Sequence, residues 1–221
     1  MKKILLILVI ISLGSLAGYA QESLGKMFKP DENTLYYDEY DRTIGVMKFM
    51  ELTGKGLYTF DPTFADGKVV SIKLKKAANS VSLGSKAPDF SVTDIHGKQY
   101  TLKELKNKIV VLHFWYTDCI PCLSGVPQLN KLARKYKNDD RVVLLAVTAD
   151  PKQKVDSFLK KTKFNFDILP SQGELIKLYG VNTYPTNMVI AQGGNVAFRN
   201  GVDNSQIVGK MDKVIDSLRS K

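Results

Sequence analysis

The chain has 221 residues, of which 44% are hydrophobic, 10% aromatic and 24% charged. This ordinary globular composition excludes collagen-like, mucin-like and wholly disordered proteins. Two cysteines in this length exclude a disulfide-stapled scaffold and a four-thiolate zinc site. The net charge of +10 is uneven along the chain, with +2 in residues 1–20, zero in 21–83 and +8 in 84–221. The chain therefore changes from electrically neutral to basic near residue 84.

The first twenty residues predict a secretory signal peptide. Lys2 and Lys3 precede the apolar run Ile4–Leu13, and small residues follow up to Ala20. We expect cleavage after Ala20. The apolar run is shorter than the roughly 20 residues that span a bilayer, so an uncleaved membrane anchor is the less favoured alternative. The mature protein is therefore expected in an exported, periplasmic compartment, where disulfides can form.

Residues 21–83 predict a small β-rich segment of unknown role. Val70, Ile72 and Leu74 alternate with polar residues, which is typical of a strand with one wet face. About 60 residues is marginal for an independent domain, and the segment carries no recognisable chemistry. We expect a structural or partner-facing appendage.

Residues 84–221 alternate strand-like and helix-like patterns, which predicts an α/β layered fold. A hairpin turn is expected at residues 95–97. Two near-continuous apolar runs, 109–115 and 142–147, are typical of strands buried on both faces. Asp150 and Pro151 offer an N-cap and a first-turn proline for a helix that ends at Lys161. Further strands are expected at 188–191 and 196–199, and further helices at 119–136, 174–179 and 204–218.

The motif Cys119-Ile120-Pro121-Cys122 follows a predicted buried strand and begins a predicted helix. At that position the first sulfur faces unpaired backbone N–H groups and the positive end of the helix dipole, which favours thiolate over thiol. We assign Cys119 as an exposed nucleophile and Cys122 as the resolving thiol. The alternatives are half of a metal site or two inert core thiols. Metal binding is disfavoured because His96 and His113 are the only histidines. We expect no metal and no cofactor.

A second feature is the proline in Tyr184-Pro185-Thr186, which precedes the apolar run 188–191. A proline at a strand start suits a cis peptide bond, because X–Pro bonds tolerate cis at a cost of about 0.5–1 kcal/mol. A cis proline opposite Cys119 would leave backbone groups free to pair with an incoming peptide. An ordinary strand-entry proline is the plainer alternative.

Residues 84–218 resemble the thioredoxin superfamily and, within it, the TlpA-like exported thiol:disulfide oxidoreductases with an AhpC/TSA-like domain. The resemblance rests on several motifs in the right order: Ala87-Pro88-Asp89-Phe90 with Gly97, Phe114-Trp115, the cysteine motif, Pro127, Tyr179-Gly180-Val181 and Tyr184-Pro185-Thr186. It implies a thioredoxin-like fold, a central mixed sheet flanked by helices with an N-terminal hairpin extension. It also implies that Cys119 and Cys122 perform the exchange beside a cis Pro185.

Three residues depart from the family pattern. Asp118 stands where tryptophan is common before the first cysteine, and its carboxylate should oppose the thiolate. Gly125 stands where many TlpA-like proteins carry a glutamate, and His113 stands where thioredoxins carry a buried acid. We interpret His113 as the base for Cys122, since imidazole titrates near neutrality. A core histidine bonded to a carbonyl is the alternative. Trp115 and Pro121 are also expected to modulate the pair.

The leading hypothesis is a periplasmic oxidoreductase that exchanges its dithiol with protein disulfide or dithiol clients. The resemblance implies a reductant supplied by a membrane-linked electron donor, and some TlpA-like members serve cytochrome c maturation. One alternative is a peroxiredoxin-like thiol peroxidase, although Tyr116 replaces the threonine expected three residues before Cys119. The others are a copper-delivery protein and a non-enzymatic thioredoxin-fold binding module. The charge of residues 84–221 is compatible with contact to an anionic membrane surface, and nucleic acid is not expected as a partner.

Overall fold

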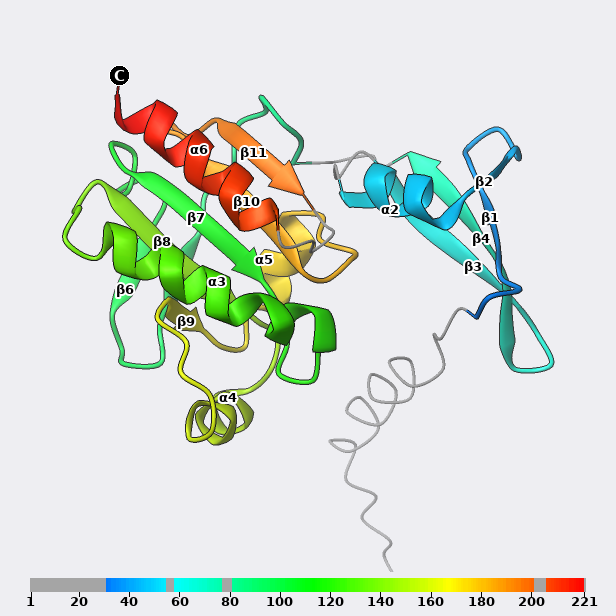
Figure 1. The fold of residues 1–221 in the computed structure, drawn as a ribbon, viewed down its shortest axis with the longest axis horizontal. Coiled ribbons are helices and arrows are strands. Elements are labelled where there is room, and N and C mark those ends of the chain that lie inside the picture. Colours follow the sequence, from blue (N-terminus) through cyan, green and yellow to red (C-terminus); the bar gives the residue numbers. More distant parts are fainter. Residues whose placement is uncertain (1–30, 55–57, 77–80, 201–205, 221) are drawn as a thin grey trace, which may run out of the picture. The chain divides into compact units, whose positions relative to one another are not determined.

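A computed structural model describes residues 31–54, 58–76, 81–200 and 206–220 of the chain (Figure 1). The predicted signal peptide, residues 1–20, lies outside the described residues, and so does residue 204, the expected start of the last helix. The chain divides into two compact units, one with Pro62–Ile72 and the segment that ends at Leu35, the other with Tyr36–Asp61 and the segment that begins at Lys73. Within the described ranges, no helix has both the length and the apolar character needed to cross a membrane.

The segment before residue 77 is rich in strands, as predicted, and also contains a helix. Its four-stranded sheet has the order β2-β1-β4-β3. The elements are β1 (Leu35–Tyr37), β2 (Thr43–Ile44), α2 (Val46–Gly54), β3 (Tyr58–Ala65) and β4 (Lys68–Lys76). Helix α2 was not predicted from the sequence; its Phe49 is buried, whereas Val46, Met47 and Met50 are exposed.

The alternation predicted for strand β4 holds only in part. Ile72 and Leu74 are buried as expected, but Val70 is 40% exposed and Val69 is buried instead. The buried positions Val69 and Ile72 lie three residues apart, so the strand departs from the two-residue period between them.

The rest of the described chain is built on a five-stranded mixed sheet with the order β11-β10-β7-β8-β9. Strands β7, β8 and β9 are parallel, whereas β10 runs antiparallel to both β7 and β11. The predicted mixed central sheet is therefore confirmed. The strands are β7 (Ile109–Phe114), β8 (Val142–Val147), β9 (Asp167–Leu169), β10 (Thr186–Ile190) and β11 (Val196–Asn200). Strand β9 was not predicted, since three residues are too few to show a period.

Helices and a hairpin cover the two faces of this sheet (Figure 1). Buried residues of α3 and α6 share one hydrophobic cluster with strand residues, and buried residues of the hairpin and α5 share the other. The elements are α3 (Ile120–Tyr136), α4 (Lys152–Leu159), α5 (Gly173–Leu178), α6 (Ile207–Arg219) and the hairpin strands β5 (Ser91–Thr93) and β6 (Gln99–Thr101). The prediction for α4 needs correction: Pro151 occupies the N-cap, no side chain caps the helix, and the helix ends at Leu159 rather than Lys161.

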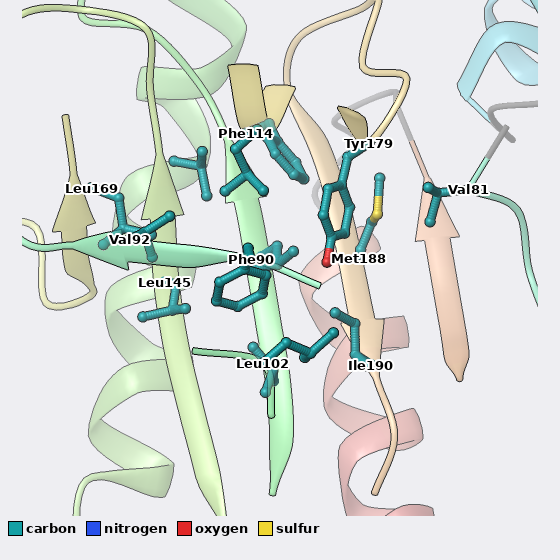
Figure 2. Packing of buried hydrophobic residues seen from close by; sticks show 14 of the residues in the cluster. Val81, Phe90, Val92, Leu102, Phe114, Leu145, Leu169, Tyr179, Met188 and Ile190 are labelled. Atoms are coloured by element: carbon teal, nitrogen blue, oxygen red, sulfur yellow. The ribbon is translucent and has the colours of Figure 1, made fainter. Parts of the chain in front are cut away.

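Strand β7 separates the two clusters because its side chains alternate between the faces. Leu112 and Phe114 point into the cluster with the hairpin and α5, part of which is shown in Figure 2, where Tyr179 lies beside Met188. Ile109 and Val111 belong to the other cluster. All six residues of β7 are buried, and complete burial of an aliphatic side chain contributes about 1.5–3 kcal/mol. The C-terminal end of β7 is thus fixed by side chains packed on both faces of the sheet.

Candidate active site

The loop between β7 and α3 is fixed by backbone hydrogen bonds at both ends. The Trp115 N–H donates to the Val147 carbonyl of β8 at 3.0 Å, which extends the sheet by one residue. The Cys119 N–H donates to the Tyr116 carbonyl at 3.1 Å, which closes a turn. Between them, the Thr117 N–H donates to Asp150 Oδ2 at 2.6 Å. The burial of β7 and the hydrogen bonds of the loop therefore fix the position of Cys119.

Cys119 is the N-cap of α3 and forms a disulfide with Cys122, with their Cα atoms 5.2 Å apart. The Cys122 N–H donates to Cys119 Sγ at 3.2 Å, so the sulfur takes the place that a serine or aspartate oxygen takes in other N-caps. Pro121, in the first turn, has no N–H to satisfy. After reduction, an N–H donor and the helix dipole would both stabilise negative charge on Cys119.

The cysteines are less accessible than the sequence suggested. Cys119 is 1% exposed and Cys122 is fully buried, so the expectation of an exposed nucleophile is wrong for the disulfide form. The neighbouring apolar side chains are exposed instead, with Ile120 at 80% and Tyr116 at 39%. Residues close to Cys119 in the chain therefore expose apolar side chains to solvent.

The proline loop lies at the same end of the sheet as the cysteine loop. The Tyr184–Pro185 peptide bond is cis, as the sequence indicated, and Pro185 directly precedes β10. Thr186, the first residue of β10, is the register partner of Phe114, the last residue of β7. The ring of Tyr184 meets that of Tyr116 edge to face, with centroids 5.3 Å apart. The two loops are thus in direct contact through their tyrosines.

His113 is a buried, uncharged side chain on β7. It is 2% exposed, and its Nδ1 lies 2.7 Å from Oδ1 of Asn187 on β10. Burial lowers the pKa of His113 to about 4, and the Asn187 hydrogen bond only partly opposes this. Since Nδ1 donates to the amide oxygen, the lone pair lies on Nε2, which has no hydrogen-bond partner among the described residues. His113 is therefore a core histidine bonded to a carbonyl oxygen, as in the alternative interpretation, and that oxygen belongs to the side-chain amide of Asn187.

Asn187 was not singled out from the sequence, although it is the register partner of His113. It lies two residues after the cis proline, directly before the apolar run 188–191. An asparagine beside such a run was the available signal, because a buried amide requires a hydrogen-bond partner. Only the pairing of β10 with β7 identifies that partner.

The carboxylate of Asp118, directly before the first cysteine, is paired with a cation. Its side chain is 74% exposed and forms an ion pair with Lys154 of α4, at 2.8 Å. Lys154 also pairs with Asp150 at 3.1 Å, and Asp150 is the acceptor of the Thr117 N–H. Neither Lys154 nor the bond from Asp150 to the loop was predicted. Asp150 had been interpreted as the N-cap of α4, whereas its carboxylate faces the cysteine loop.

The remaining residues expected to modulate the pair occupy different environments. Trp115 is fully buried, packs against Phe158 and Phe164 with centroids 5.0 and 5.3 Å away, and shares a cluster with both cysteines. Its indole N–H has no hydrogen-bond partner within the part of the chain that the structure describes. Pro121 is exposed. Among the described residues, no group of three or more His, Cys, Asp or Glu side chains is arranged to hold a metal ion.

A cysteine pair at a helix N-terminus, next to a cis proline on a mixed sheet, defines a thioredoxin-fold thiol-disulfide oxidoreductase. Residues 83–199 match the model of the AhpC/TSA family. The chain belongs to this family, as a TlpA-like member of the thioredoxin superfamily.

Relatives of known name agree with this class. The thiol-disulfide oxidoreductase ResA of Bacillus thuringiensis subsp. konkukian is 40% identical over 118 residues, which cover 52% of this chain and 68% of ResA. A structure assigned as the thiol:disulfide interchange protein DsbE of Chlorobium tepidum is 27% identical with a TM-score of 0.58, covering 63% of this chain and 99% of that one. The exposed lipoprotein thioredoxin of Streptococcus pneumoniae is 26% identical with a TM-score of 0.50, covering 61% and 100%.

The buried His113 makes a prediction about stability at low pH. The unfolded chain binds a proton at this histidine near pH 6.5, whereas the folded chain binds it only near pH 4. Stability present above pH 6.5 is therefore lost as the pH falls towards 4, by on the order of 3 kcal/mol. We expect His113→Asn to flatten this part of the profile of unfolding free energy against pH, measured by urea denaturation. His96→Asn, which changes the exposed histidine, is the matched control and should keep the wild-type slope. Parallel profiles for wild type and His113→Asn would contradict the assignment.

Proposed function

We propose that this protein is an exported reductant of protein disulfides that works through the Cys119–Cys122 couple. The observation that carries the proposal is the capping geometry, in which Cys119 Sγ accepts the Cys122 N–H at 3.2 Å. The same geometry would hold a thiolate ready for attack once the pair is reduced. The cis Pro185 in the adjoining loop supports a client peptide that pairs along the backbone there.

The proposed reaction conserves electrons and protons between the two partners. The Cys119 thiolate attacks one sulfur of the client disulfide, whose S–S bond breaks and releases a client thiolate. Cys122 then loses its proton and attacks Cys119 Sγ, which forms the internal disulfide and releases the second client thiolate. The client leaves reduced by two electrons, and this protein is left oxidised. A membrane-linked dithiol donor would restore the pair by the reverse exchange.

We assign His113 the role of accepting the Cys122 proton. The ring is neutral, and its buried Nε2 lone pair has no partner in the described ranges. It packs edge-on against Phe164 and Phe166, which belong to the same buried cluster as Cys122. The interpretation from the sequence assumed an imidazole that titrates near neutrality, but burial lowers the pKa of His113 to about 4, so the ring would hold the proton only transiently. Asn187 would hold the ring in the required tautomer.

The biological setting follows from the sequence and the family. The signal-peptide pattern of residues 1–20 supports export with cleavage after Ala20. The TlpA-like resemblance supports the reductant direction, a membrane-linked donor and a role in cytochrome c maturation. We regard residues 84–221 as the catalytic domain and residues 21–83 as an appendage.

Substitution of each cysteine separates the two steps. Cys119→Ser should abolish exchange with a disulfide-bonded client protein, because the attacking sulfur is lost. Cys122→Ser should instead stop after the first step and accumulate a mixed disulfide with the client, visible as a reducible adduct by mass spectrometry. Peroxide consumption by the wild type should stay at the level of Cys119→Ser. Rapid peroxide consumption without client exchange would favour the thiol peroxidase, and exchange unchanged in Cys119→Ser would overturn the proposal.

The relay role predicts a specific kinetic defect. His113→Ala should slow resolution of the mixed disulfide by roughly tenfold or more near neutral pH, since general base catalysis contributes about 10²–10⁴-fold. Formation of the mixed disulfide should be little affected, because Cys119 does not use this base. The two phases are measured by quenched-flow trapping as a function of pH. Equal rates and equal pH profiles for wild type and His113→Ala would remove the histidine from the mechanism.

A further inference from the structure

Helix α4 contributes a charged side chain to the loop that carries the cysteines. Lys154 Nζ lies 2.8 Å from Asp118 Oδ2 and 3.1 Å from Asp150 Oδ1. Asp150 is only 14% exposed, and its other oxygen accepts the Thr117 N–H at 2.6 Å. Lys154 therefore ties together the two residues that directly precede Cys119 and the carboxylate that holds them. Partial burial lowers the pKa of Lys154, but hydrogen bonds to the two carboxylates outweigh this and raise it overall, so the ammonium stays charged.

Two titratable side chains near this loop, Tyr184 and His113, are uncharged at neutral pH. Burial first, and then Tyr116 and Asp150, raise the pKa of Tyr184 to about 12. The field of Asp150 thus also acts on the cis-proline loop. His113 is neutral as well. Among the described residues, the charges that contact the cysteine loop belong to Asp118, Asp150 and Lys154.

We propose that Lys154 is a positioning residue that sets the reactivity of Cys119 by neutralising Asp118 and holding the Thr117–Asp118 loop against Asp150. This inference rests on the proposed function, since it concerns the thiolate used there. It assigns the carboxylate before the nucleophile a partner on another helix. The pair Asp118–Lys154 then acts as a local charge balance for the thiolate.

The sign of the effect follows from electrostatics. A carboxylate near Cys119 disfavours the thiolate and raises the thiol pKa, whereas a cation favours the thiolate and lowers it. With Lys154 in place, the charge of Asp118 is compensated. The N–H bond and the dipole at the N-terminus of α3 then determine how well the Cys119 thiolate is stabilised. Without Lys154, two carboxylates face the loop with no cation. The pair is partly exposed, so salt should weaken the effect.

The test measures the pKa of Cys119 in the reduced protein, from the pH dependence of its alkylation rate. Lys154→Gln should raise this pKa by about one unit, which corresponds to about tenfold less thiolate at low pH. Asp118→Asn should lower it, and Lys154→Gln combined with Asp118→Asn should return it close to wild type. Lys154→Arg should preserve it. High salt should shrink the differences, which a purely structural defect would not show.

Lys152→Gln is the matched control, because it removes one cation from the same helix, where Lys152 pairs with Asp156 instead. It should leave the pKa of Cys119 unchanged. Equal shifts in Lys152→Gln and Lys154→Gln, or a double variant that keeps the full shift of Lys154→Gln, would overturn the inference. If the wild type shows no rapidly alkylated thiol and no client exchange, the proposed function itself fails. If the wild type exchanges normally but the Lys154 variants titrate like it, only the role of Lys154 fails.

Discussion

The first turn of α3 begins with backbone N–H groups that have no acceptor within the helix, and Cys119 Sγ accepts one of them. The surrounding elements of the domain fix the position of that sulfur at the helix terminus. Strand β7 is buried on both faces and ends five residues earlier, so the loop to Cys119 has little freedom. The register of β10 against β7 then brings the cis Pro185 to the same edge. The redox couple therefore depends on one helix cap whose position is fixed by a fully buried strand.

The charges around this cap make the two sulfurs unequal. Both cysteines are buried in the apolar cluster with Trp115, but Cys119 receives the N–H bond and directly follows Asp118, which pairs with Lys154. A buried thiol without a cation resists ionisation, so its proton needs an acceptor. We propose the neutral His113, in contact with aromatic rings of that cluster, as this acceptor. The asymmetry supports the proposed roles of Cys119 as nucleophile and Cys122 as resolving thiol.

Local sequence patterns predicted the parts of the structure that depend on local chemistry. The apolar runs of β7 and β8, the Cys-x-x-Cys motif at a helix start and the cis proline all leave a signature within a few residues. Helix α2 and strand β9 were missed because both are short, with nine and three residues. Asn187 and Lys154 were missed for another reason, since each meets its partner only through the tertiary fold. The same holds for Asp150, whose carboxylate contacts the cysteine loop and not the helix that it precedes.

The reduction potential of the Cys119–Cys122 couple tests the central claim most directly. It is obtained by equilibrating the purified protein with glutathione or dithiothreitol buffers and counting free thiols. A reversible two-electron couple near or below about −250 mV is the predicted result, because a reductant of protein disulfides must give up its electrons readily. A potential nearer about −120 mV would mark a disulfide donor, and the absence of any reversible disulfide would contradict the oxidoreductase mechanism.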